Sequence, residues 1–189
     1  MSLRFSKRGE CTEEERAAVT DYYAEATYFH ACAQGWSGPL GDSPKLSAFM
    51  ARAAGLAGRI DAAIEKFEVA EPGEVYFGSG SGYSCIGSLG GPPERFVGLT
   101  YQYLGYTSTS IHRSVAEDFV RARASGSLSP VLLQIILVPG MRALPVDQVT
   151  GQCGEGEVLL PRKSRLVIKA ASSVRIDDVE PDVLLLELA

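Results

Sequence analysis

Apolar residues in the first third of the chain recur every three to four positions, which is the spacing of an amphipathic helix. Thr12, followed three residues later by Glu15, forms a capping box and predicts that a first helix begins there. Ser43 and Pro44 place an N-cap serine before a proline at the first helical position. They predict a second helix, with an apolar stripe over residues 46–67. The N-terminal third is therefore predicted to be helical.

From residue 73 onwards the pattern changes to short apolar runs between glycine-rich segments. Residues 112–124 keep helical spacing, whereas residues 131–138 form an almost continuous apolar run, typical of a strand buried on both faces. The other predicted strands, which bring the sheet to about six, are residues 74–77, 104–108, 158–160, 165–170 and 183–188. Helices followed by strands indicate the α+β class, with a helical part (residues 1–72) and a β-rich core (residues 73–189) in one compact domain.

The composition narrows the classes of partner. The formal net charge of −5 argues against nucleic acid or an anionic membrane as the main partner. No apolar run approaches the roughly 20 residues of a membrane-spanning helix, and the N-terminus lacks the apolar centre of a secretory signal. The four cysteines are scattered without a Cys-x-x-Cys pair, which favours reduced thiols over a disulfide framework or a zinc site.

Residues 78–91 form a glycine- and serine-rich segment after a predicted strand, and we interpret it as a mobile surface loop. Its glycines lack the Gly-x-Gly-x-x-Gly spacing of a dinucleotide-binding fingerprint. It also contains no Gly-x-Ser-x-Gly, the nucleophile elbow of serine hydrolases. A nucleophilic pair of Cys85 or Cys153 with His112 stays open on composition, although no local pattern supports it.

Glu155 and Glu157 stand two residues apart, directly before the apolar run of residues 158–160. If this segment is extended, both side chains project from the same face of a strand. Like charges repel at that distance, so a solvated surface gains little from the pair, whereas a site that applies two carboxylates to one substrate gains more. For an isolated Glu-x-Glu, a solvated acidic turn that enters a strand is the simpler alternative. The motifs upstream decide between the two.

Three hydroxyl residues, Ser108, Thr109 and Ser110, follow a predicted strand and directly precede a predicted helix. On its own this run would be an ordinary serine or threonine N-cap. Its place between a strand that contains Val-Tyr and the later Glu-x-Glu pair gives it a second interpretation.

The Val-Tyr strand, the Ser-Thr-Ser run and the Glu-x-Glu pair follow one another in an order that resembles the ADP-ribosyltransferases of the cholera-toxin-like, Arg-Ser-Glu group. The resemblance covers about residues 74–169 and includes Glu-Val-Leu-Leu-Pro at residues 157–161, a run typical around the catalytic glutamate of that group. It implies an ADP-ribosyltransferase-like fold, with a split, mixed β-sheet core and an N-terminal helical part. One position departs from the pattern, because enzymes of this group usually have Val-Tyr-Arg-Gly on the first strand and this chain has Phe77 in place of the arginine.

The resemblance implies NAD as the substrate and no metal. It makes Glu157 the catalytic glutamate, which bonds the 2′-hydroxyl of the nicotinamide ribose while the glycosidic bond breaks. A preplaced carboxylate stabilises the oxocarbenium-like centre that forms when nicotinamide leaves. Glu155 resembles the glutamate that positions the acceptor side chain or takes a proton from it.

Three further groups of residues receive roles from the same resemblance. The residues expected to contact NAD are Ser108, Thr109, Ser110, Tyr76, Phe77 and Gly78. Because phenylalanine cannot bind a phosphate, a cation from elsewhere is expected to do so, and the candidates are Arg95, Arg113, Arg121 and Arg123. The loop expected to meet the protein target comprises Gly151, Gln152, Cys153 and Gly154.

The implied function is mono-ADP-ribosyl transfer from NAD to a side chain of a target protein, with release of nicotinamide. Arginine is the default acceptor, because a glutamate at the position of Glu155 usually goes with it in the family, and a ubiquitin-like target is one alternative. The resemblance to stand-alone bacterial toxins implies a secreted, monomeric virulence effector that acts in the host cytoplasm. Two other functions stay open: an NAD- or protein-binding module that has lost catalysis, suggested by Phe77, and an NAD glycohydrolase.

Overall fold

The computed structural model describes residues 3–22, 44–79, 92–103, 105–123, 130–151, 154–177 and 183–189. Several expectations fall on other residues and lie outside the described part: the end of the first helix, the loop of residues 80–91, Leu104, Gln152 and Cys153. Among the described residues, no helix is long and apolar enough to cross a membrane.

Two helices open the fold where the sequence predicts them. The first begins at residue 13, and its described part reaches residue 22. Its capping box is confirmed, because the Glu15 N–H donates to Thr12 Oγ1 over 3.2 Å and the Thr12 N–H donates to the Glu15 carboxylate over 2.8 Å. α2 (Pro44–Ile64) begins at the predicted proline.

A two-stranded sheet that the sequence did not predict adjoins these helices. β1 (Arg4–Lys7) pairs antiparallel with β2 (Phe67–Glu71). The apolar stripe predicted for the second helix does not reach Phe67, because α2 ends at Ile64 and Phe67 opens β2. Phe67 is nevertheless buried, so the strand takes over the contact with the core that a longer helix would have made.

The main sheet contains eight strands among the described residues, in the order β4-β9-β10-β6-β3-β5-β8-β7. Neighbouring strands run antiparallel except for the parallel pair β10 and β6, so the sheet is mixed. The predicted strand over residues 104–108 is found slightly later in the chain, as β5. The strands are β3 (Gly73–Ser79), β4 (Thr100–Gln102), β5 (Thr107–Ser110), β6 (Val131–Leu137), β7 (Leu144–Pro145), β8 (Glu157–Leu160), β9 (Arg165–Val174) and β10 (Val183–Leu188).

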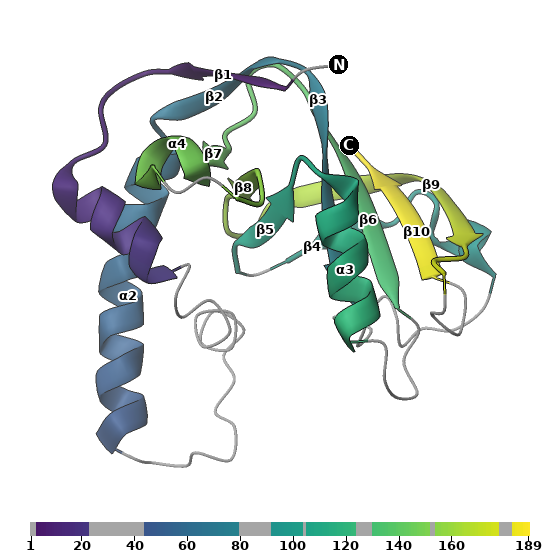
Figure 1. The fold of residues 1–189 in the computed structure, drawn as a ribbon, viewed down its shortest axis with the longest axis horizontal. Coiled ribbons are helices and arrows are strands. Elements are labelled where there is room, and N and C mark those ends of the chain that lie inside the picture. The colour runs from purple at the N-terminus through teal and green to yellow at the C-terminus, as the bar shows by residue number, and fades with distance from the viewer. Residues whose placement is uncertain are drawn as a thin grey trace.

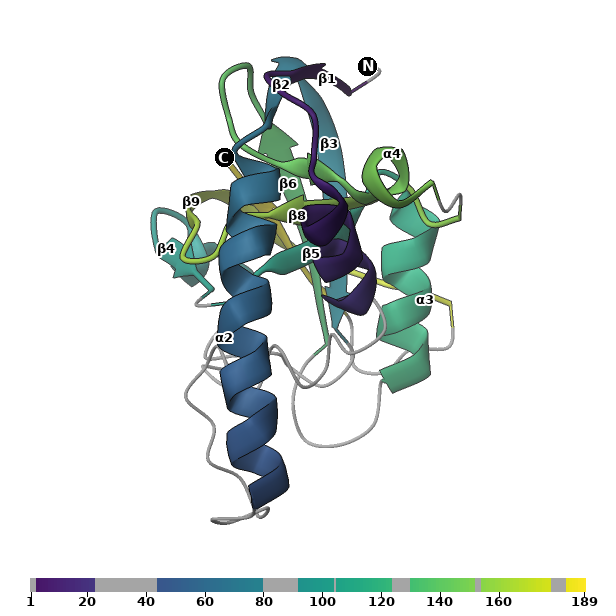
Figure 2. The ribbon, with the colours of Figure 1, turned by 90° about the vertical axis from the view of Figure 1, so that its left-hand side faces the viewer.

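The two faces of this sheet pack against different partners. On one face, Val75, Leu133 and Leu160 join a core that includes Phe96 of the short 3-10 helix η2 (Pro93–Phe96). On the other face, α2 and the first helix cover β7 and β8, while α3 (Arg113–Arg123) covers β3 and β6. β5 and β8 therefore run between α2 and α3, as Figure 1 and the turned view in Figure 2 show. The predicted α+β class is confirmed.

Candidate active site

The Ser-Thr-Ser and Glu-x-Glu motifs lie on two neighbouring strands. β5 pairs antiparallel with β8, and the register sets Ser110 opposite Glu157. Because side chains alternate across a strand, Ser108, Ser110 and Glu157 share one face. Tyr76 of β3 pairs with Ser110 and so belongs to the same row. The structure thus brings together residues from three of the segments that sequence analysis singled out.

Glu157 is the first residue of β8 and is only 7% exposed. The Ser108 hydroxyl donates a hydrogen bond to its Oε1 atom. Its Oε2 atom is buried and has no hydrogen-bond partner within the part of the chain that the structure describes. A buried carboxylate oxygen without a donor is costly, and such an atom in a native protein calls for an explanation. A ligand that brings a hydroxyl donor would remove the cost.

The other two hydroxyl groups fix the backbone around this carboxylate. Thr109 Oγ1 donates to the Val158 carbonyl oxygen over 2.6 Å. The Ser110 hydroxyl donates to the Glu155 carbonyl oxygen and also accepts from the His112 N–H over 2.9 Å. All three side chains of Ser-Thr-Ser are therefore used to hold the Glu-x-Glu segment, which is more than a helix N-cap requires.

The pKa of Glu157 is raised above its ordinary value. Burial is the largest cause, since it disfavours the charged form, and the negative charges of Glu155 and Asp147 act in the same direction. The Ser108 hydrogen bond opposes them, because it stabilises the carboxylate. Ser108 therefore helps to keep Glu157 ionised in a buried position.

The two glutamates are not related as in a continuous strand. Gly156 has a φ of 58°, in the left-handed region, and its carbonyl accepts from the Ile111 N–H over 3.0 Å. The expectation that Glu155 and Glu157 share a strand face is therefore wrong, because the chain turns between them and β8 starts only at Glu157. Glu155 is half-buried on that turn, and its charge still acts on Glu157.

Asp147 is a residue that sequence analysis did not single out and whose negative charge acts on Glu157. It lies in α4 (Val146–Thr150), a five-residue helix that ends at Gly151, whose φ of 70° forms a left-handed C-cap. No motif spacing pointed to Asp147, because its effect on the Glu157 pKa depends on how the chain folds at α4. Gly151 and Gly154, which belong to the loop expected to meet a target, are exposed.

The three β3 residues expected near NAD face in two directions. Tyr76 packs against the α3 cluster, donates its hydroxyl to Glu74 over 2.6 Å, and has a pKa raised to about 12 by burial and by this bond. Phe77 packs on the opposite face, against the core that contains Val75. Gly78 faces α3, since a Cβ built on it would lie 1.8 Å from the Ala116 carbonyl oxygen.

The four candidate arginines are dispersed. Arg95 lies on η2, with its guanidinium 5.4 Å from the centre of the Phe96 ring. Arg113 is in the first turn of α3 and donates through Nε to Glu117 over 2.8 Å. Arg121 pairs with Glu117, Asp118 and Asp177. Arg123 ends α3, and its side chain lies outside the described part.

The described residues contain no group of three or more His, Cys, Asp or Glu side chains placed to hold a metal ion. Cys11, the cysteine that the structure describes, is a free and buried thiol. The pKa of this thiol is raised, chiefly by burial, so Cys11 is a poor nucleophile.

Comparisons with known proteins match the chain to one family model and to several solved structures. Residues 58–186 match the family model described as ADP-ribosyltransferase exoenzyme. The chain is similar to the Clostridium limosum C3 exoenzyme, with 19% identity, a TM-score of 0.67 and coverage of 94% of this chain and 86% of that one. It is also similar to Plx2a, an ADP-ribosyltransferase toxin from Paenibacillus larvae, with 21% identity, a TM-score of 0.68 and coverage of 94% and 87%.

A third similar structure is the ADP-ribosyltransferase Vis of Vibrio splendidus in complex with agmatine, with 18% identity, a TM-score of 0.65 and coverage of 97% of this chain and 78% of that one. At these identities the solved structures establish the fold alone. No curated protein sequence matches the chain with statistical significance.

Proposed function

Since the chain belongs to the ADP-ribosyltransferase exoenzyme family and is an NAD-dependent ADP-ribosyltransferase, we propose that it transfers one ADP-ribose from NAD to an arginine of a host protein. The observation that carries this proposal is the buried Oε2 atom of Glu157, which has no partner among the described residues while Ser108 holds Oε1. A ribose hydroxyl of NAD would donate to this oxygen. It would thereby hold the carboxylate beside the carbon from which nicotinamide leaves.

The charges in this site support the following steps for the transfer of ADP-ribose. The bond between the ribose C1′ atom and the nicotinamide nitrogen breaks, and nicotinamide departs with the electron pair. The positive charge that develops on the ribose is stabilised by the ionised Glu157 carboxylate. A nitrogen of the acceptor guanidinium then forms the new bond to C1′, and Glu155 takes the proton that this nitrogen loses.

Arginine as the acceptor is supported by two observations. Glu155 is a carboxylate at the edge of the site, and carboxylates bind guanidinium groups through paired hydrogen bonds. The similar enzyme Vis was solved with agmatine, a small molecule that ends in a guanidinium group. We further propose that the chain is a secreted bacterial effector that acts in the host cytoplasm, with a ubiquitin-like protein as one candidate target.

Incubation with labelled NAD and a eukaryotic cell lysate tests this function directly. We expect label on a small number of proteins, and peptide mapping by mass spectrometry should place it on arginine. Label on a different residue type would contradict the arginine acceptor but not the transferase. Cleavage of NAD without any labelled protein would favour the glycohydrolase alternative.

Replacing Glu155 with glutamine is expected to separate transfer from hydrolysis. Transfer to protein should fall by about 10²-fold or more, because an amide cannot take the acceptor proton. Slow cleavage of NAD should continue, because bond breaking depends mainly on Glu157. Protein labelling and nicotinamide release are measured side by side on the same preparation. An equal loss of both activities would show that Glu155 does not act only on the acceptor.

We also propose that Arg113 contacts the diphosphate of NAD, because Phe77 has no charge and packs on the face of β3 opposite to Tyr76. Arg113 begins α3, separated from the Ser-Thr-Ser strand by Ile111 and His112, and its charge acts on Tyr76, which shares a row with Glu157. The Nε atom of Arg113 donates a hydrogen bond to Glu117. Arg121 is a weaker candidate, because it is already paired with Asp118 and Asp177 as well as Glu117.

Replacing Arg113 with alanine is expected to weaken NAD binding by about 1.5–3 kcal/mol, the range for a lost hydrogen bond to a charged group. Calorimetry of NAD binding measures this loss, with Arg121→Ala as the matched control from the same helix. Equal affinities of parent and Arg113→Ala protein would mean that another group holds the phosphates. Failure of the parent to bind NAD would instead favour a pocket that has lost its function.

A further inference from the structure

The strand pair that holds Ser108 and Glu157 is anchored at its far end. The β5–β8 ladder runs from the Ser110–Glu157 pair to the Thr107–Leu160 pair. Tyr106 directly precedes the first strand of this ladder, and Arg162 follows the second strand by two residues. Both side chains reach across to the same residue of α2, Asp61.

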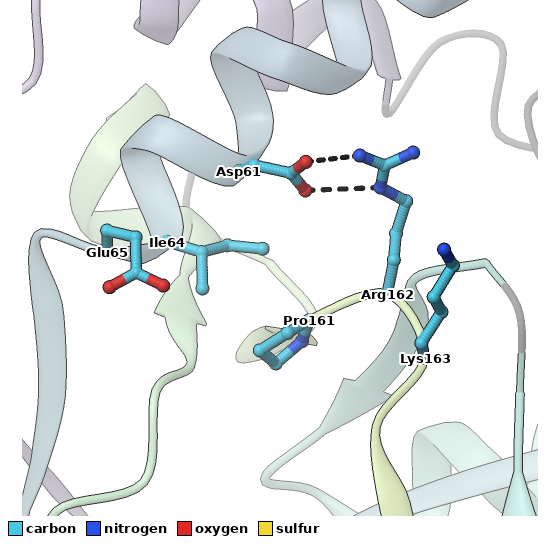
Figure 3. A pocket seen from close by; sticks show the side chains of 6 residues that line it. All are labelled: Asp61, Ile64, Glu65, Pro161, Arg162 and Lys163. Carbon is cyan, nitrogen blue, oxygen red and sulfur yellow. Dashed lines mark hydrogen bonds and ion pairs between the residues drawn. The ribbon is translucent and has the colours of Figure 1, made fainter.

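Asp61 joins the two strand ends through a compact set of contacts, part of which Figure 3 shows. Its Oδ1 atom accepts from the Tyr106 hydroxyl over 2.7 Å and from Arg162 Nε over 3.2 Å, and its Oδ2 atom accepts from the same guanidinium. Arg162 also lies over the Tyr106 ring, 5.6 Å from its centre. Asp61 and Arg162 border a cavity of about 300 Å³ that is also lined by Ile64, Glu65, Pro161 and Lys163.

The Tyr106 ring is locked in this arrangement from a second side. It is almost fully buried, its centre is 5.5 Å from that of the Tyr22 ring in an edge-to-face contact, and its hydroxyl also lies 2.8 Å from the Ala57 carbonyl oxygen. Burial raises the pKa of this hydroxyl, and the bond to Asp61 adds to the rise. Tyr106 is therefore a neutral hydrogen-bond donor at neutral pH.

We propose that Asp61 is a positioning residue for ADP-ribosyl transfer, which fixes the β5–β8 register through Tyr106 and Arg162 and thereby the Ser108–Glu157 hydrogen bond. A slip of one residue in this ladder would move every side chain of a strand to the opposite face. The ladder joins only residues 107–110 to residues 157–160, so an end anchor matters more than it would in a longer pair. The inference rests on the proposed catalytic role of Glu157.

This role differs from that of a stabilising ion pair. The Asp61 and Arg162 side chains are 41% and 37% exposed, and ion pairs so open to water contribute little to the free energy of folding. The Asp61→Asn protein is therefore expected to fold. What it loses is the charge that orders Tyr106 and Arg162 at the ends of both strands.

The test compares Asp61→Asn with Asp21→Asn in the full chain. Asp21 pairs with Arg52 of α2 at a similar exposure, over 3.1 Å, and this pair involves neither Tyr106 nor Arg162, so it is a matched control. For Asp61→Asn we expect kcat for NAD cleavage to fall about tenfold while KM changes little, because small displacements of reacting groups are costly. The acid limb of the pH profile of kcat should move to higher pH, because the Ser108 bond that lowers the Glu157 pKa is weakened.

Three outcomes decide the inference. In a Ser108→Ala background, Asp61→Asn should not shift the pH profile further, and a full additional shift would contradict action through Ser108. If the parent cleaves NAD and the Asp61→Asn protein has the same kcat and the same pH profile as the parent, the inference is wrong. The proposed function is then unaffected. A parent that does not cleave NAD would overturn the proposed function.

In that case amide hydrogen exchange tests whether Asp61 holds the β5–β8 pair. Faster exchange over residues 107–110 and 157–160 in Asp61→Asn than in Asp21→Asn supports this role of Asp61, and equal exchange overturns it.

If Asp61→Asn fails to fold, Tyr106→Phe provides a second test, because it removes the hydroxyl that contacts Asp61 and also the Ala57 carbonyl oxygen. The same fall in kcat and the same shift of the acid limb are expected, with a smaller amplitude since Arg162 remains. An unchanged profile in a folded Tyr106→Phe protein would overturn the inference.

Discussion

Replacing Glu157 with glutamine is expected to slow both NAD cleavage and transfer by a few hundredfold. The amide keeps the shape of the side chain and can still accept the Ser108 hydrogen bond, but it no longer brings a charge to the cationic ribose. Loss of a preorganised charge of this kind costs on the order of 3–4 kcal/mol in the transition state. Release of labelled nicotinamide, measured with and without protein acceptor, reports the two rates.

The matched control is Glu94→Gln, which makes the same chemical change at an exposed position on η2. It should leave both rates at the level of the parent. Near-normal turnover by a folded Glu157→Gln protein would exclude Glu157 as the catalytic glutamate.

The same substitution is expected to raise stability at neutral pH. The pKa of Glu157 is raised in the folded protein, chiefly by burial, so the native state holds this proton more tightly than the unfolded chain does. The contribution of Glu157 to the free energy of unfolding is therefore fully present below its pKa in the unfolded chain, which is about 4.3. This contribution is lost as the pH rises through the higher pKa of the folded protein. At pH 7 the ionised carboxylate destabilises the fold, and glutamine removes that penalty.

Thermal unfolding of parent and Glu157→Gln protein at pH 7 and near pH 4 measures this effect. The variant should have the higher Tm at pH 7, and the difference should shrink in acid. A lower Tm at pH 7 would mean that the carboxylate stabilises the fold rather than serving chemistry at its expense. A variant that is more stable and also inactive cannot owe its inactivity to unfolding.

The sequence predicted the motifs of this site better than their geometry. Ser108 and Glu157 were recognised by order and residue type, and the structure pairs them on adjacent strands. The prediction that Glu155 and Glu157 share a strand face was wrong. A Glu-x-Glu motif before an apolar run indicates an extended segment, but Gly156, which lies between the two glutamates, has a positive φ. Glycine permits that conformation without requiring it, so the sequence alone left it undetermined.

Contacts between distant segments account for most of what the sequence did not predict. β1 and β2 each have too few residues to stand out, and they form because Phe5 pairs with Val69 far along the chain. Asp61 and Arg162 are 101 residues apart, and neither belongs to a motif. Periodicity and local caps did predict α2, α3 and β6, because those signals lie within one segment.

Replacing Gly78 with alanine is expected to cause the largest loss of stability among single changes in the β3–α3 contact. A Cβ on Gly78 would lie 1.8 Å from the Ala116 carbonyl oxygen and 2.7 Å from its carbonyl carbon. These atoms belong to the backbone of α3, so no side-chain rotation can make room, and the whole helix has to move off the sheet. Forced overpacking of this kind costs typically up to about 3 kcal/mol and here is expected to reach or exceed that value.

Thermal unfolding should show this cost as a fall in Tm of about 6–12 °C for a domain of this size. Gly58→Ala is the matched control, because Gly58 lies on the exposed side of α2 and a Cβ there would meet no described atom within 4 Å beyond its own stretch of helix. That variant should gain about 0.5–1 kcal/mol, since alanine is the better helix former. Because only Ile111 and His112 separate Ser110 from α3, displacement of the helix by Gly78→Ala should also loosen the strand that holds Ser108. A Gly78→Ala protein as stable as the parent would mean that α3 does not rest on β3 at this distance.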